Sequence, residues 1–405
     1  MIKEVLYFGY HPNCSCSGLS EDIISATNSE MSPYNYNKLK KLGIRSFRES
    51  VEAEIKKNQE HDLHVVPISA GLDSRAILAA LIESAKIENK SITTVSFGVP
   101  RSWDFNIGQK VSTSAGIDNV AVDLTDDDFD WSINSLQNYA QTLQQPTRIF
   151  ESYINSTIPD LFDENALIWS GFLGDPTTGS HQPKSPSNNW ESACEHFVEH
   201  NKHSDLFSEQ LVDPVRILPD SPYVDREYLS YEEQLDFGHR QMCFIAPLLF
   251  SESGNYATPF TQPVWLEYSL NLPSKYRENR SLFIDIVTKM YPELFSLPSD
   301  MRHGLPPTAG KLQWYIQLGK LYTKMKLSNV LGTGYIYPGI NYLDFESRFR
   351  ESGELSTTVK SLVKRFDSRN INDINAMEIW NKHQDGYNYE KALRTICSIE
   401  LFLYE

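Results

Sequence analysis

The sequence has few cysteines and no long apolar run. Five cysteines stand at scattered positions among 405 residues, and one residue separates Cys14 from Cys16, a spacing typical of neither a zinc site nor a redox motif. No run of 18 or more apolar residues occurs, so no membrane-spanning helix is expected. Residues 1–12 lack the apolar core of a secretory signal. These absences predict a cytoplasmic protein with reduced thiols and no membrane partner.

Positive charge is also scarce. Lys and Arg total 37 against 53 Asp and Glu, which gives a net charge of −16 at pH 7. A polyanion is repelled by such a field, and the one short basic run, at residues 38–41, is typical of the exposed start of a helix. The sequence therefore predicts no nucleic-acid partner. It does not exclude a small anion that binds in a pocket together with a divalent cation.

Apolar segments alternate with helical patterns over the first half of the chain. Strands are expected at residues 63–69, 91–99, 119–124 and 165–175, and helices between them at residues 74–86 and 104–116, after a helix at residues 42–58. This alternation predicts an α/β fold with a doubly wound parallel sheet. Pro67 favours an edge or irregular position for its strand, because proline cannot donate to a sheet ladder. A further strand is expected at residues 4–10.

The second half of the chain has a mostly helical pattern. It follows a polar, proline-containing loop or partial linker at residues 176–189, and helices are expected at residues 262–272, 282–291 and 390–405. We therefore expect three parts: a short N-terminal segment at residues 1–41, an α/β core at residues 42–185 and a helical part at residues 186–405. His196 and His200 have the spacing of a zinc-binding pair, but no further ligand completes the set, so a polar surface helix is favoured.

The junction after the first core strand carries a polar motif, Ser-Ala-Gly-Leu-Asp-Ser at residues 69–74. The start of a helix after a parallel strand exposes unpaired N–H groups that bind anions. Gly71 permits close approach, the hydroxyls of Ser69 and Ser74 can donate to phosphate, and Asp73 can hold a Mg²⁺ ion. Ser69 and Asp73 could instead cap the helix, and the motif alone leaves both interpretations open. It lacks the Gly-Lys-Ser ending of a Walker A loop.

The segment "ISAGLDSR" resembles the S-G-G-L-D-S pyrophosphate loop of the asparagine synthetase family, with Ala70 in place of one glycine. Five more stretches resemble that family in the same order: "TVSFGVPRSWD", "IWSGFLGDPTTG", "TPFTQPVWLEYSLNLPSKYR", "LPSDMRHGLPPT" and "WNKHQDGYNYEKALRTICSIELFL". The resemblance covers the chain from about residue 42 onward. It implies the fold of the PP-loop ATP pyrophosphatases, which is of the adenine nucleotide alpha hydrolase-like type.

The resemblance also implies an activity and a set of site residues. Family members use ATP to adenylate a carboxylate, release pyrophosphate and form an amide with an amine or ammonia. By position, Asp73 and Asp175 would hold Mg²⁺ and take part in catalysis, and Arg302 replaces a catalytic lysine. The residues expected to bind ATP are Ser69, Gly71, Leu72, Asp73, Ser74, Phe97, Ser170 and Gly171. Asp104 matches an acidic position of the family, although a helix N-cap explains it equally well.

Several departures from the family pattern bear on the substrate. Phe172 and Gln262 replace two acids of the family, and Arg302 cannot lose a proton as a lysine can. Lys311 is a candidate substitute for that lysine. These changes predict a small-molecule or peptide carboxylate substrate and not ordinary asparagine synthesis.

The nitrogen source departs from the family as well. Residue 2 is isoleucine where the family's glutaminase domain has its cysteine, and residues 1–41 are too few for that domain. A separate glutaminase, free ammonia or an amine on the substrate would then supply the nitrogen. The last option describes a peptide or small-molecule cyclase in natural-product or polysaccharide biosynthesis. A non-catalytic, regulatory ATP- or AMP-binding protein and an enzyme that transfers AMP are the remaining alternatives.

Overall fold

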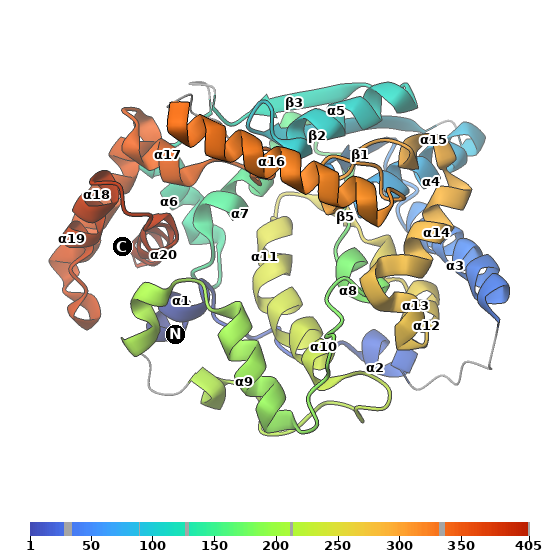
Figure 1. Ribbon diagram of the computed structural model, residues 1–405, viewed down its shortest axis with the longest axis horizontal. Coiled ribbons are helices and arrows are strands. Elements are labelled where there is room, and N and C mark those ends of the chain that lie inside the picture. Colours follow the sequence, from blue (N-terminus) through green and yellow to red (C-terminus); the bar gives the residue numbers. More distant parts are fainter. Residues whose placement is uncertain (28–34, 89, 126–128, 211–213, 332–336, 404–405) are drawn as a thin grey trace.

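The computed structural model of the chain describes residues 1–27, 35–88, 90–125, 129–210, 214–331 and 337–403. Its centre is a five-stranded sheet in the order β3-β2-β1-β4-β5, and every neighbouring pair is parallel (Figure 1). The predicted α/β class with a parallel sheet is confirmed. The strands are β1 (Leu63–Pro67), β2 (Ser91–Gly98), β3 (Asn119–Asp123), β4 (Ala166–Trp169) and β5 (Asn255–Ala257).

The strand order changes direction between β1 and β4. From β1 the chain continues to β2 and β3 on one side, and it then returns to place β4 and β5 on the other side. In open parallel sheets a crevice forms at the carboxyl ends of the strands on either side of such a switch point. Residues that directly follow β1 and β4 therefore lie at the place where ligands bind in this architecture.

Two strand predictions are wrong. The strand with Pro67 is central and not at an edge. Pro67 is the last residue of that strand and lies opposite Val95. The ladder continues past it, because the Ile68 N–H donates to Val95 O at 2.8 Å. The strand expected at residues 4–10 is instead largely helical: α1 spans Ile2–Phe8 and is capped by Gly9 with φ 77°. Because four consecutive residues of α1 are buried, its sequence lacks the polar face that distinguishes a helix from a strand.

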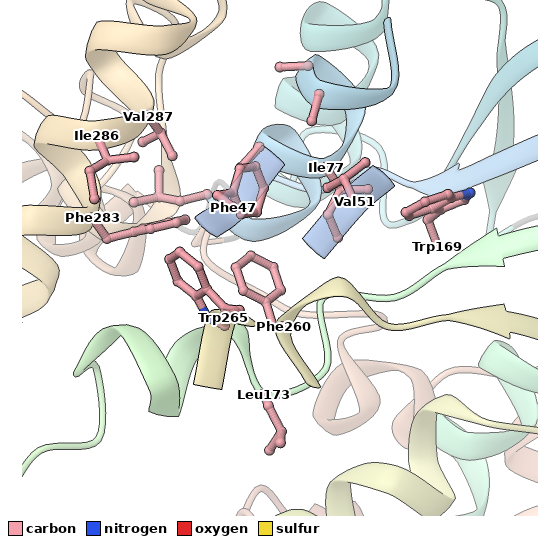
Figure 2. Packing of buried hydrophobic residues seen from close by; sticks show 14 of the residues in the cluster. Phe47, Val51, Ile77, Trp169, Leu173, Phe260, Trp265, Phe283, Ile286 and Val287 are labelled. Carbon is pink, nitrogen blue, oxygen red and sulfur yellow. The ribbon is translucent and has the colours of Figure 1, made fainter. Parts of the chain in front are cut away.

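Helices cover the sheet on both faces. On one side, α3 (Tyr36–Lys57) and α4 (Asp73–Glu88) pack with α12 (Pro263–Leu270) and α14 (Ser281–Met290) in the largest core. Figure 2 shows this core, in which the Phe47 ring of α3 lies 5.5 Å from Phe260 and 5.6 Å from Trp265. Trp169 of β4 extends the same core toward the sheet. Buried aromatic area of this kind is the main force that holds α3 against the C-terminal half.

The C-terminal helices form a second core. They are α17 (Phe345–Arg350), α18 (Glu354–Arg369), α19 (Ala376–Gln384) and α20 (Glu390–Phe402), and they pack with α1, α6 (Ile133–Thr142) and α7 (Ile149–Ser156). Figure 1 shows α17–α20 on the opposite side of the molecule from α3 and α14. A small apolar cluster on β1, β2 and β4, with Val65, Val95 and Ile168, lies on the sheet face away from α3. The remaining helices are α2 (Glu21–Thr27), α5 (Trp103–Ala115), α8 (Gly174–Thr178), α9 (Trp190–Asn201), α10 (Tyr231–Leu235), α11 (Ala246–Leu249), α13 (Ser274–Arg277), α15 (Pro292–Phe295) and α16 (Lys311–Leu331).

The predicted helical character of the second half is confirmed by α12, α14 and α20; residues 404–405 of the last prediction lie outside the described residues. The sequence pattern missed β5, which has only three residues.

His196 and His200 are exposed on α9, and no third histidine, cysteine or acid joins them among the described residues. No helix in the described ranges has the length and apolar character needed to cross a bilayer.

Candidate functional site

A cavity of about 340 Å³ lies at the carboxyl ends of β1, β2 and β4. It is lined by residues of the 69–74 loop, by the turn after β4, and by Asp300 and Tyr342 from the second half of the chain. The structure therefore brings together segments that are more than 200 residues apart. The predicted site residues that line the cavity are Ser69, Gly71, Asp73, Ser74, Phe97, Ser170, Gly171 and Asp175.

The 69–74 loop is held by short-range hydrogen bonds. Gly71 N–H donates to Ser69 Oγ at 3.2 Å, and Ser69 N–H donates to Ser74 Oγ at 3.4 Å. Ala70 N–H donates to Asp104 Oδ1 at 3.1 Å, which ties the loop to α5. The two serine hydroxyls lie 3.4 Å apart and both line the cavity. The loop thus presents two hydroxyl donors beside the first turn of α4, whose N-terminal end carries partial positive charge.

Asp73 and Asp175 meet at one guanidinium. Asp73 begins α4 after β1, and Asp175 lies in α8 after β4. Arg280 donates from Nη2 to Asp73 Oδ1 and from Nη1 to Asp175 Oδ1, the latter at 2.6 Å. The backbone of Arg280 is left-handed, with φ 60°, at the start of α14. Such a conformation costs a non-glycine residue about 1–3 kcal/mol, so the surrounding contacts must hold Arg280 in this position.

Sequence reasoning missed Arg280. It follows α13 at the end of a segment with no phosphate or metal motif, and its partners are 105 and 207 residues away. The Arg280 guanidinium also lies 4.9 Å from the Phe283 ring, which positions it from the side of α14. Nothing in its local sequence distinguishes it from a surface arginine between two helices.

The cavity holds an excess of carboxyl groups. Burial raises the pKa of Asp73 to about 7, with Asp175 adding to the effect and Arg280 opposing it. Burial and the charge of Asp300 raise the pKa of Asp104 to about 6, against the hydrogen bond from Ala70. Burial also raises the pKa of Asp300. Such a cluster gains stability when a cation binds, because the cation favours the ionised carboxylates.

The donor set of the cavity fits Mg²⁺. Carboxylate oxygens are the protein ligands that Mg²⁺ takes, usually one or two together with phosphate and water oxygens. Asp73 and Asp175 supply two such oxygens within reach of one guanidinium. A metal ion between them would take over the positive charge that Arg280 now supplies.

The other end of the cavity is aromatic. Phe97, near the end of β2, stacks on Tyr342 with ring centroids 5.5 Å apart and an interplanar angle of 22°. The Asn155 side-chain amide donates to the Tyr342 hydroxyl at 3.1 Å. Burial raises the pKa of Tyr342 to about 12, so the hydroxyl stays neutral. Flat rings beside an amide group form the type of surface against which a nucleobase packs.

Two predicted residues, both described by the structure, lie away from the cavity lining. Leu72 is 1% exposed and its side chain packs in the large core, so it fixes the shape of the loop instead of facing a ligand. Arg302 points its Nε to Pro307 O at 3.4 Å, in the turn that follows Asp300. The cation that the structure places among the carboxylates is Arg280 instead.

The structure shows the surroundings of the residues at which the sequence departs from the resemblance. Phe172 is buried with its ring 5.3 Å from Phe250, and Gln262 donates to Glu54 Oε1 at 2.6 Å. Lys311 is exposed at the start of α16. Ser102 is the N-cap of α5, so the capping interpretation of Asp104 is wrong: that carboxylate bonds the 69–74 loop.

The arrangement can bind a small, flat molecule that carries negative charge. Serine hydroxyls, acids suited to a divalent cation and an aromatic pair line the cavity, and the buried Arg280 pairs with two of the acids. No protein-family model matches the chain, and no curated protein matches it. The chemistry of the cavity must therefore be inferred from its own residues.

Proposed function

We propose that the chain is an ATP-dependent, AMP-forming amide ligase of the asparagine synthetase type, with the fold of a PP-loop ATP pyrophosphatase. One observation carries the proposal: Asp73 and Asp175, which follow the neighbouring strands β1 and β4, meet in one cavity beside the hydroxyls of the 69–74 loop. Acids at the carboxyl ends of two adjacent parallel strands can share one metal ion. The aromatic pair at the far end supports a nucleotide over inorganic pyrophosphate alone.

The cavity suggests how ATP would lie. The base would pack against Phe97 and Tyr342, and the β- and γ-phosphates would lie at the loop hydroxyls. Mg²⁺ held by Asp73 and Asp175 would supply the charge that makes pyrophosphate a good leaving group. Arg280, which pairs with both acids, would add a further positive charge next to them, and that charge is permanent at neutral pH.

The reaction has two steps. A carboxylate oxygen of the substrate attacks the α-phosphorus, and pyrophosphate leaves as the P–O bond breaks. A nitrogen nucleophile then attacks the acyl carbon, loses a proton and displaces AMP. The substrate would be a small-molecule or peptide carboxylate, and the nitrogen would come from ammonia, from a separate glutaminase or from an amine on the same substrate.

A pyrophosphate-release assay tests the proposal. The purified protein is incubated with ATP, Mg²⁺ and a library of carboxylates and amines; AMP and pyrophosphate should form together and only with an acceptor. Asp73→Asn should reduce the rate by about 10²-fold or more, since it removes a ligand of the Mg²⁺ that would neutralise the leaving pyrophosphate. Glu164→Gln, which changes an exposed acid just before β4, is the matched control and should keep the wild-type rate. Release without dependence on Asp73 would contradict the assignment.

A second function is favoured by Arg280 itself. Because its guanidinium occupies the space between the two acids, the protein could bind ATP or AMP without a metal and without turnover. Calorimetry separates the two functions. Nucleotide affinity that is independent of Mg²⁺, with no pyrophosphate release for any acceptor, would support a regulatory nucleotide-binding protein.

A further inference from the structure

Three of the five cysteines come together in space. The sulfur atoms of Cys14, Cys16 and Cys243 all lie within 4.8 Å of one another. Cys14 Sγ and Cys16 Sγ are 2.7 Å apart, and Cys14 N–H donates to Cys243 Sγ at 3.4 Å. All five cysteines are free thiols, as expected, but these three are gathered in space although they are scattered along the sequence. No local pattern predicts the cluster, because 229 positions separate Cys14 from Cys243.

The fold builds this cluster from two segments that are fixed to each other. Residues 12–18 cross a π-helical segment, Asp236–Ile245, and Gly18 N–H donates to Gly238 O at 2.8 Å. Cys243 is fully buried and its thiol donates to Pro12 O at 3.3 Å, while Cys16 is exposed. One side of the cluster is therefore closed by protein and the other side is open to solvent.

We propose that Cys14, Cys16 and Cys243 bind one zinc ion, with water in the fourth position. Zn²⁺ takes thiolate ligands in tetrahedral geometry, and a Zn–S bond of about 2.3 Å places sulfurs roughly 3.8 Å apart. The observed separations, 2.7 Å to at most 4.8 Å, bracket that value, so small side-chain rotations complete the site. Among the described histidines, cysteines and acids no fourth ligand joins the three.

His239, which lies on the same π-helical segment as Cys243, is occupied elsewhere. His239 uses Nδ1 with Pro12 O at 2.7 Å and Nε2 with the Tyr223 hydroxyl at 2.9 Å. The open position therefore falls on the solvent side, next to Cys16.

The ion would connect the N-terminal segment to the wall of the nucleotide cavity. The π-helical segment continues directly into α11, whose last residue, Leu249, lines the cavity. Zinc at Cys243 would fix the N-terminal residues 12–18 on this continuous helix. A zinc ion held in this way would contribute free energy to folding, because the ligands are assembled only in the folded state.

Metal analysis of the full chain tests the inference. The protein is produced in medium with Zn²⁺ and purified without chelators, and bound metal is measured by mass spectrometry. We expect one zinc per chain in the wild type and loss of that zinc in Cys16→Ser; the exposed position of Cys16 lets this variant fold. Replacement of Zn²⁺ by Co²⁺ should give the thiolate-to-metal charge-transfer absorption in the wild type and not in Cys16→Ser.

Two control variants test whether the loss of zinc is specific to the three-cysteine cluster. Cys397→Ala changes a buried cysteine of α20 outside the cluster and should retain the zinc, and so should Asp73→Asn, which removes a cavity acid. The inference is overturned if the wild type carries no zinc and shows no Co²⁺ charge-transfer band. It is equally overturned if freshly prepared protein holds Cys14 and Cys16 in a disulfide. Metal content is measured without ATP, so either result is independent of the ligase proposal.

Discussion

Gly174 lies directly against the carboxyl group of Asp73: a Cβ added at Gly174 would fall 2.6 Å from Asp73 Cγ. Real side chains do not approach so closely, and Asp73 is held on its other side by Arg280. The absence of a side chain at Gly174 therefore sets the position of the acid. The turn after β4 contributes Asp175 to the cavity and also makes room for Asp73.

Gly174→Ala should displace the Asp73 carboxylate and weaken binding of Mg²⁺–ATP by about tenfold to a hundredfold, because small misplacements at a charged site have large effects. Overpacking should also lower the free energy of unfolding by about 1–3 kcal/mol. Calorimetry and urea unfolding measure the two effects. Gly319→Ala on α16, where a Cβ meets no atom within 4 Å, is the control and should leave affinity unchanged. Wild-type affinity in Gly174→Ala would contradict the role of Asp73.

Arg280→Met should leave two neighbouring acids without their counter-charge. The Arg280 side chain is 7% exposed and that of Asp73 13%, so breaking this pair should cost about 3–5 kcal/mol of unfolding free energy. If the acids form a metal site, millimolar Mg²⁺ should restore part of the loss, because the ion binds only the folded state. Urea unfolding with and without Mg²⁺ measures both effects.

A surface ion pair provides the comparison for Arg280. Arg45 is 74% exposed and pairs with Glu49 at 2.7 Å, so Arg45→Met should not change stability measurably. An Arg280→Met protein whose stability is the same with and without Mg²⁺ would show that the acids do not hold the ion.

The parts of the site that could be predicted are those set by local chain geometry. Ser69, Asp73 and Asp175 directly follow strands, and the carboxyl ends of parallel strands converge, so their order in the sequence implies their proximity. The same reasoning gave the α/β class, because strands and helices of ordinary length alternate. The α/β class and the 69–74 loop need only periodicity and the position of polar residues after a strand, whereas Asp175 was singled out by the resemblance.

The parts that could not be predicted depend on contacts across the chain. Arg280 reaches the acids from a left-handed turn, and Cys243 joins Cys14 and Cys16 from a helix more than 200 residues away. No local sequence pattern encodes such long-range contacts, which depend on how the layers of the fold pack against one another. The strand prediction for residues 4–10 failed for a related reason, because the consecutive buried residues 5–8 of α1 show no diagnostic period.

His64 should make the protein less stable in mild acid. It is buried in β1 and accepts the Trp169 Nε1–H at 2.9 Å through Nδ1, and burial, with a smaller effect of Lys90, lowers its pKa to about 4. An unfolded histidine binds a proton below about pH 6.5, whereas folded His64 does not until about pH 4. Between these values His64 should reduce the unfolding free energy by up to about 1.4 kcal/mol for each unit of falling pH.

Unfolding in urea between pH 7 and pH 4.5 measures this contribution. His64→Gln keeps an acceptor for Trp169 but cannot be protonated, so its stability should fall less steeply than that of the wild type. His200→Gln, at an exposed histidine, should follow the wild-type curve. Parallel curves for His64→Gln and the wild type would show that His64 does not titrate between the two states.

Arg75 does not line the cavity, but we expect its loss to weaken nucleotide binding as well as to lower the stability of the fold. Its side chain is fully buried and donates to the carbonyls of Leu294 and Leu297 through Nη1 and to those of Ala70 and Pro298 through Nη2. It thus joins the 69–74 loop to the segment that leads to Asp300. Arg75→Met should leave buried carbonyls unpaired and lower the unfolding free energy by about 3 kcal/mol or more.

Arg75→Lys separates charge from geometry at this position. Lysine keeps the positive charge but has one nitrogen, which cannot replace the planar fork that reaches both segments. We expect Arg75→Lys to remain folded, to lose part of the stability and to show faster hydrogen exchange at residues 297–302, together with weaker nucleotide binding. Because only the link between the two segments differs, exchange and affinity should change together. Wild-type exchange in Arg75→Lys would show that the loop and the Asp300 segment are held together by the surrounding core and not by this side chain.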